Sequence, residues 1–111
     1  MRTDATDALF KILADPTRRR ILDLLAERGP LNVTQLAVEF PDLVTSGISK
    51  HLMGLRSAAL VYATRDGRQQ IYSLDASAMA GGLAPWLKKY DRFWGGALGR
   101  LRRLAEDEAE E

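Results

Sequence analysis

The sequence contains no cysteine and a single histidine, His51. Without cysteine the chain cannot form disulfides, bind metal ions through thiolates or carry a thiol nucleophile or redox sensor. A lone histidine cannot supply a cluster of metal ligands, and the sequence suggests no carboxylate partner that would make it a general base. These shortages argue against an enzyme and against a metal or other cofactor.

Long apolar segments are also missing. No stretch approaches the roughly 18 residues that a transmembrane helix needs, and the first ten residues, MRTDATDALF, lack the apolar run of a signal peptide. We therefore expect a cytoplasmic protein without a membrane partner. The 111 residues leave room for one compact domain, which excludes a second, catalytic one.

The net charge is only +1, but acidic residues are concentrated at the end of the chain. Five of the 15 acids lie in the last six residues, EDEAEE, so residues 1–105 hold 16 basic and 10 acidic residues, a charge of +6. We expect a domain over residues 1–105 and an acidic tail over residues 106–111. Such a charge suits a polyanion partner, although a solvated surface with a solubilising tail fits equally well.

Hydrophobic periodicity predicts a mainly helical chain. Thr6 or Asp7 is expected to cap a short first helix, and Asp15-Pro16 to start a second one that ends at Arg28. The apolar side of these two helices is formed by Ala8, Leu9, Ile12, Leu13, Ile21, Leu22, Leu24 and Leu25.

Two further helices are predicted in the middle of the chain. A short one covers Gln35 to Phe40, with Thr34 as its N-cap, and the segment from Phe40 to Val44 breaks it. The next begins at Thr45, and its inward positions follow the i, i+4, i+7 spacing of an amphipathic helix: Ile48, Leu52 and Leu55. Its other side carries small polar groups and one cation: Ser46, Gly47, Ser49, Lys50, Met53 and Gly54.

A β-hairpin and a long helix complete the pattern. Leu60 to Arg65 and Gln69 to Leu74 are β-type runs joined through Asp66-Gly67-Arg68, a tight-turn signal. From about Leu83 to Ala105 we expect one long helix. Its apolar residues follow a spacing of three and four that approximates a coiled-coil seam: Leu83, Leu87, Tyr90, Trp94, Leu98, Leu101 and Leu104.

Two short helices followed by a basic-tipped hairpin describe a winged helix-turn-helix. The second helix of the pair fits the major groove of DNA, where each base pair shows a distinct pattern of donors and acceptors, while the first braces it. The hairpin reaches phosphates or the adjoining minor groove. The predicted fold is therefore mainly α with a small β-hairpin, a winged helix-turn-helix with a long C-terminal dimerisation helix.

Four segments follow one another in this order: LADPTRRRILDLL, VTQLA, ISKHLMGLRSAALV and RDGRQQIYSL. Through these four segments the sequence resembles the ArsR family of bacterial repressors. The resemblance spans roughly Leu9 to Leu74. It implies a homodimer that reads a pseudo-palindromic site, with the first and last helices at the interface. Two departures stand out: the segment from Phe40 to Val44 is one residue longer than the usual connection, and Ala59 stands where glycine is common.

The family pattern places Thr45, Ser46, Ser49 and Lys50 toward DNA. The serines can donate to phosphates or base edges, and Lys50 can contact a phosphate or guanine. For Ser46, capping of the helix is an equally good interpretation and is compatible with DNA contact. His51 belongs to the same segment, but its position before Leu52 favours a structural role at the edge of the core.

The wing contacts are expected at Arg65 and Arg68, with Gly67 supplying the turn. Thr34 and Gln35 begin the bracing helix, whose N-terminus can bind a phosphate through backbone amides. The resemblance assigns the dimer interface to the first and last helices, on the residues Leu9, Leu83, Leu87, Tyr90, Trp94, Leu98 and Leu101.

Metal sensing, common in this family, is not expected. The bracing helix has no thiolate, and the last helix offers only Asp91 as a ligand before the acidic tail. The aromatic residues Trp86, Tyr90, Phe93 and Trp94 could line an effector pocket, but a core or subunit contact is the more ordinary role. A small-molecule effector is left open.

The predicted function is a sequence-specific, DNA-binding transcriptional repressor. An enzyme is the first rival and lacks the residues for catalysis. The second is a winged helix used only for protein contacts. That rival would not need an exposed serine-lysine helix face beside a doubly basic wing, and it stays as the alternative.

Overall fold

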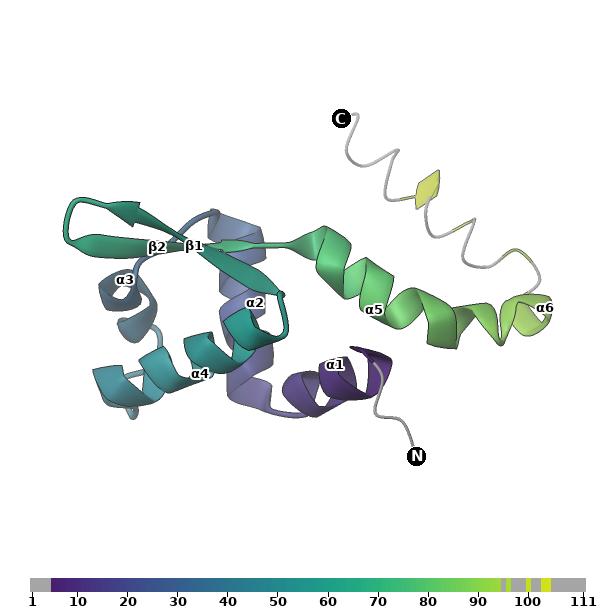
Figure 1. Cartoon of the computed structure of the whole chain (residues 1–111), viewed down its shortest axis with the longest axis horizontal. Coiled ribbons are helices and arrows are strands. Elements are labelled where there is room, and N and C mark those ends of the chain that lie inside the picture. Colours follow the sequence, from purple (N-terminus) through teal and green to yellow (C-terminus); the bar gives the residue numbers. More distant parts are fainter. Residues whose placement is uncertain (1–4, 95, 97–99, 101–102, 105–111) are drawn as a thin grey trace.

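The computed structural model describes residues 5–94, 96, 100 and 103–104. It is mainly helical with one two-stranded antiparallel sheet, as predicted. The hairpin, α3 and α4 gather at one end of the molecule, and α5 extends from the other (Figure 1). The elements in chain order are α1 (Ala5–Leu13), α2 (Pro16–Arg28), α3 (Val33–Ala37), α4 (Thr45–Ser57), β1 (Val61–Asp66), β2 (Gln69–Leu74), α5 (Ala76–Lys88) and α6 (Asp91–Trp94).

The predicted limits of α2 are confirmed. The Asp15 carboxylate caps the helix by accepting hydrogen bonds from the amides of Thr17 (2.8 Å) and Arg18 (3.3 Å). Pro16 occupies the first turn, where its missing N–H costs nothing. At the other end, Gly29 adopts a φ of +82° and its amide donates to the Leu25 carbonyl.

α2 contributes the largest share of the core. Its four apolar residues are buried together with the inward residues of α4, as the periodicity predicted. Truncating such a side chain to alanine typically costs about 2–5 kcal/mol. The buried cluster consists of Leu9, Ile21, Leu22, Leu24, Leu25, Leu31, Leu36, Ile48, Leu52, Leu55, Leu60 and Val61.

The start of α1 differs from the prediction. The helix already includes Ala5, so neither Thr6 nor Asp7 is its cap. Thr6 is buried instead, and its hydroxyl donates a hydrogen bond of 2.6 Å to the carbonyl of Gly82. The residue therefore joins α1 to α5, across 76 positions of sequence.

The prediction for α3 was wrong in both its cap and its limits. Asn32, not Thr34, caps the helix, which begins at Val33 and ends at Ala37. The Asn32 side chain accepts from the Gln35 amide, and the Gln35 side chain accepts from the Asn32 amide, each at 2.8 Å. This reciprocal capping box satisfies two amides at once, which Thr34 could not do from inside the first turn.

α4 begins at Thr45, as predicted, which settles its register after the longer connection. It ends in a Schellman motif: the Ala59 amide donates to Arg56 (2.9 Å) and the Leu60 amide to Leu55 (3.0 Å). Ala59 has a φ of +63° there, the left-handed conformation that glycine adopts most easily. The expectation of glycine at this position, which the sequence resemblance implied, thus has a local structural reason.

The hairpin is confirmed with a shorter turn than expected. Asp66 belongs to β1 and pairs with Gln69, so only Gly67 and Arg68 form the connection. Gly67 has a φ of +64°, typical of tight two-residue turns. β2 also pairs with the segment before α3, because Leu31 and Tyr72 exchange two backbone hydrogen bonds of 2.9 and 3.0 Å.

A single helix from Leu83 to Ala105 is not observed. α5 starts earlier, because Asp75 caps it by accepting from the Ala78 amide, and it ends at Lys88. The amides of Lys89 and Tyr90 donate to carbonyls three residues back, which tightens the chain into a turn before α6. Of the expected seam, Leu98 and Leu101 lie outside the described residues.

Candidate nucleic-acid interface

Three elements lie at the same end of the molecule: α3, α4 and the hairpin (Figure 1). A hollow of about 320 Å³ lies between them. Ser49 reaches it from α4, Thr34 from α3 and Arg68 from the turn. The structure thus brings together residues that the sequence assigned to three separate DNA contacts.

The solvent side of α4 presents hydroxyl groups and one cation. Ile48, Leu52 and Leu55 are completely buried on its opposite side and fix the helix against α2. Thr45 to Ser57 contains no acidic residue, so nothing in the helix repels a phosphate. A shallow hollow runs along its exposed face, lined by Val44, Ser46, Gly47, Ser49, Lys50 and Met53.

Ser46 does not occupy the N-cap position of α4. Val44 holds the N-cap position and makes no capping hydrogen bond through its side chain. Only its carbonyl serves the first turn, by accepting from the amides of Gly47 (2.9 Å) and Ile48 (3.3 Å). Ser46 itself is exposed in the first turn of α4, where its hydroxyl faces the shallow hollow.

His51 is half-buried on α4, and its charge acts on Asp15, the N-cap of α2. Burial alone would raise the pKa of Asp15. The hydrogen bonds from the amides of Arg18 and Thr17, and the charges of His51 and Arg18, outweigh it and hold this pKa below its ordinary value. The placement supports the structural interpretation of His51 over DNA contact.

The wing residues Arg65, Gly67 and Arg68 are all exposed. Arg65 folds back over the turn, because its Nε donates a hydrogen bond of 3.1 Å to the Gly67 carbonyl. Arg68 lines the hollow shared with α3 and α4. The two arginines therefore differ in role: Arg65 shapes the tip, and Arg68 faces the common surface.

Sequence reasoning missed a polar contact that joins the wing to α3. The Asn32 side chain donates a hydrogen bond of 2.9 Å to Gln69, which precedes Gln70 in β2, and all three residues line the hollow. Two consecutive glutamines at the start of a strand were the available signal. Gln35 uses its side chain in the capping box, where it accepts from the Asn32 amide. Thr34 is also exposed, and its side chain takes no part in the capping box.

The residues expected at a dimer interface fall into two groups. Leu9 is only 3% exposed and packs within its own chain, whereas its neighbour Phe10 is exposed. On α5, Leu83 and Leu87 are half-buried. Further along lies an exposed aromatic hollow of about 400 Å³, lined by Trp86, Tyr90, Phe93 and Trp94.

The aromatic residues contact one another edge to face. The Trp86 ring centroid lies 5.3 Å from that of Phe10 and 5.3 Å from that of Tyr90. The cluster thus joins α1 to the end of α5. No helix in the described part of the chain is long and apolar enough to span a membrane, and no three potential metal ligands gather among those residues.

Known proteins resemble this chain in sequence. Residues 13–61 match a family described as a helix-turn-helix domain. The HTH-type transcriptional regulator Rv2034 of Mycobacterium tuberculosis is 37% identical over 105 residues, or 95% of this chain and 92% of that protein. The transcriptional repressor SdpR of Bacillus subtilis is 37% identical over 71 residues, or 64% of this chain and 77% of that protein.

Solved structures resemble it in fold. The crystal structure of an ArsR family transcriptional regulator matches with a TM-score of 0.71 at 28% identity, covering 83% of this chain and 98% of that one. The solution structure of Mb0332 from Mycobacterium bovis, a homodimeric winged helix-turn-helix DNA-binding domain, matches with a TM-score of 0.63 at 29% identity. This second match covers 78% of this chain and 81% of that one.

Proposed function

This chain belongs to the ArsR family of winged helix-turn-helix transcriptional regulators, and on that premise we propose that it binds a pseudo-palindromic operator in double-stranded DNA as a homodimer and represses transcription there. The family and the fold are those of regulators, not of enzymes. A module for protein contacts alone is the weaker alternative, because an acid-free helix face beside two wing arginines suits a polyanion.

One observation carries the proposal: Ser49 of α4, Thr34 of α3 and Arg68 of the wing line a single hollow. A duplex whose major groove receives α4 would pass its backbone along the other two elements. Phosphate contacts from α3 and the wing position the protein, and contacts from α4 to base edges specify the sequence. The Asn32–Gln69 hydrogen bond holds the two positioning elements together.

Within α4, we divide the side chains on the DNA-facing side by the contacts that their chemistry allows. We assign base or phosphate contacts to Thr45, Ser46 and Ser49, whose hydroxyls can both donate and accept. Lys50 is assigned to a phosphate or to guanine, and Met53, 68% exposed, can contact a thymine methyl. His51 remains in the segment, but we assign it to the packing of α4 against α2.

The homodimer is assigned to the surface formed by α1, α5 and α6. Large aromatic side chains exposed together on one face commonly mark a subunit contact. Leu83, Leu87, Tyr90 and Trp94 keep their assignment, and Phe10 and Trp86 are added to it. We assign residues 1–105 to DNA binding and dimerisation, and residues 106–111 to an acidic tail.

Operator binding can be tested without knowing the target. Genomic fragments that the purified protein retains are sequenced, and the recovered site is used to titrate wild type, Ser49→Ala, Lys50→Ala and the control Lys88→Ala. We expect the first two variants to bind about 5- to 150-fold more weakly, since a base or charged contact is worth about 1–3 kcal/mol. Lys88, exposed at the end of α5, should be neutral. Random fragments, or equal affinities of all four proteins, would refute the assignment.

A further inference from the structure

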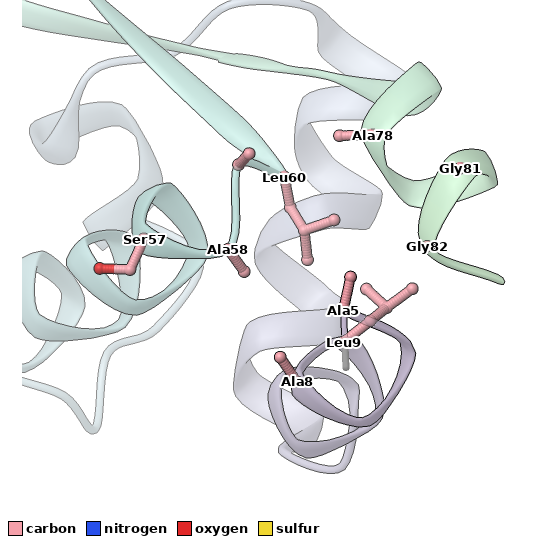
Figure 2. A pocket seen from close by; sticks show the side chains of 10 residues that line it. Ala5, Ala8, Leu9, Ser57, Ala58, Leu60, Ala78, Gly81 and Gly82 are labelled. Carbon is pink, nitrogen blue, oxygen red and sulfur yellow. The ribbon is translucent and has the colours of Figure 1, made fainter. Parts of the chain in front are cut away.

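A pocket of about 390 Å³ lies away from the DNA-facing surface, between α1, the end of α4 and α5 (Figure 2). Five alanines, two glycines, two leucines and one serine line it. Leu60 and Leu9 are almost completely buried and form its floor, and their side chains point toward one another in Figure 2. The pocket shares no residue with the aromatic hollow assigned to the dimer.

The walls of the pocket are held in place by contacts of their own. On one side, the hydrogen bond from Thr6 to Gly82 ties α1 to α5, and a Cβ at Gly82 would come within 2.9 Å of Leu9. The absence of a side chain at Gly82 therefore lets the two helices lie this close together. On the other side, the Schellman motif around Ala59 fixes the chain where α4 leads into β1. The pocket is thus bounded by three fixed elements with short side chains.

Its chemistry selects an uncharged ligand. None of the ten lining residues carries a charge, and the hydroxyl of Ser57 is the one polar side-chain group among them. A charged molecule would therefore find no ionic partner among the residues that line the pocket. The volume falls within the roughly 300–1,000 Å³ typical of small-molecule sites, and apolar cavities are known to admit apolar ligands.

We propose that this pocket binds an uncharged, mainly apolar small molecule about the size of a bicyclic aromatic, and that occupancy changes the affinity for DNA. The second part rests on the proposed function. Ser57 and Ala58, at the end of the helix proposed to enter the major groove, form one wall, and α1 and α5 form the others. A ligand that contacts all three elements therefore biases how α4 sits relative to the dimerisation helices.

The pocket offers a matched pair of variants within one helix. Ala78 lines it, whereas Ala80, two residues further along α5, is exposed and does not. Ala78→Leu fills the volume, and Ala80→Leu makes the same chemical change outside it. Ala8→Val, from the α1 side, provides a second filling variant if Ala78→Leu fails to fold.

Binding is tested on the DNA-free, full-length protein, with indole as the probe and methyl NMR as the readout. We expect saturable shifts of the Leu9 and Leu60 methyl signals in wild type and Ala80→Leu, and at least tenfold weaker binding in the filled variant. Absent shifts, or equal binding by the filled and control variants, would overturn the site. Shifts that follow protein concentration instead of indole would show that a second copy covers the pocket and would also overturn it.

Coupling is measured separately, as operator affinity with and without saturating indole. Allosteric couplings are typically about 5- to 150-fold, and we expect a change of about tenfold that Ala80→Leu retains and Ala78→Leu loses. Indole binding without any change in operator affinity would overturn the coupling but leave the site. A protein that binds no DNA even without indole would refute the proposed function, and the NMR result would stand independently.

Discussion

The guanidinium group of Arg18 lies directly against Gly54 of α4. A Cβ at residue 54 would lie 3.4 Å from Nη2 and 3.6 Å from Nε of this arginine. The Nε atom is buried and has no hydrogen-bond partner among the described residues. The first turn of α2 therefore supports α4 through close packing at a glycine, and the side chain that makes this contact is polar.

The contact predicts how α4 tolerates larger residues. Gly47→Ala should raise the free energy of unfolding by about 0.5–1 kcal/mol, the usual gain in helix propensity. Gly54→Ala should raise it by less, because the new Cβ would crowd Arg18. A Cβ at Gly47 meets nothing closer than 4.0 Å. Gly54→Leu should displace Arg18 and weaken operator binding. Urea unfolding and DNA titration measure the two effects, and equal gains for both alanine variants would contradict the packing argument.

Acid stability should depend on Asp15. The pKa of Asp15 is lower in the folded protein than its ordinary value of 3.8. The ionised carboxylate therefore stabilises the fold fully at pH values above the pKa of the unfolded state, and this contribution is lost as the pH falls through the folded pKa. Asp15→Ala should cost about 1 kcal/mol at pH 7, as expected for removal of an N-cap. Urea unfolding should show the gap to wild type narrowing below about pH 4. Asp15→Asn is the control, because asparagine can cap the helix but does not titrate. If the difference in free energy of unfolding between wild type and Asp15→Ala stayed constant with pH, titration of Asp15 would be excluded as the cause.

The left-handed conformation of Ala59 predicts a stabilising substitution. Ala59→Gly should raise the free energy of unfolding by about 1 kcal/mol, because glycine adopts this conformation without the steric cost of a Cβ. Ala58→Gly is the control, since Ala58 has a φ of −86° and should instead be destabilised by glycine. Thermal unfolding of both variants shows whether each one is more or less stable than wild type. A lower melting temperature for Ala59→Gly would contradict a left-handed conformation at residue 59.

The wing predicts a change in the salt dependence of binding. Replacing Arg65 and Arg68 with alanine should weaken operator affinity and flatten the plot of log affinity against log salt by about 0.9 for each phosphate that is no longer neutralised. The double variant Lys88→Ala and Lys89→Ala removes the same charge from α5 and its C-cap, where both residues are exposed. Fluorescence anisotropy at several salt concentrations measures both slopes. Identical slopes in the two variants would place the phosphate contacts elsewhere.

The aromatic cluster predicts the strength of the dimer. Trp86→Ala removes the exposed ring that contacts both Phe10 and Tyr90. Loss of an aromatic side chain that a subunit interface buries typically costs about 2 kcal/mol or more, a roughly 30-fold weaker dimer. Sedimentation equilibrium measures the dissociation constant of the dimer. Tyr62→Ala, which removes an exposed aromatic side chain on β1, is the control and should leave this constant unchanged. A monomeric wild type at working concentrations would overturn the homodimer itself.

Local periodicity was enough to predict the helix that is proposed to read DNA. The spacing of Ile48, Leu52 and Leu55 depends on the helix alone, so it indicated both the buried side of α4 and, by difference, its exposed side. The start at Thr45 followed from the same register. The hairpin was equally local, because Asp-Gly between two alternating segments dictates a tight turn.

The features that were missed depend on distant residues. Asn32 and Thr34 are both residue types that commonly cap helices, so the sequence alone does not distinguish them. In the fold Asn32 is the cap, and its side chain also donates a hydrogen bond to Gln69, 37 positions away. The seam of apolar residues after Leu83 shows which positions share a face, but the same spacing continues across the turn at Lys89 and Tyr90. A periodic pattern therefore cannot show where one helix ends and the next begins.

The pairing of Leu31 with Tyr72 has a consequence for the energetics of binding. These two hydrogen bonds attach β2 to the chain that enters α3, so the wing is already oriented relative to the bracing helix in the free protein. A loop that becomes ordered only on contact with DNA loses conformational entropy, at about 1–2 kcal/mol for each residue fixed. Preorganisation avoids most of this loss, and more of the interaction energy at Arg68 then appears as affinity.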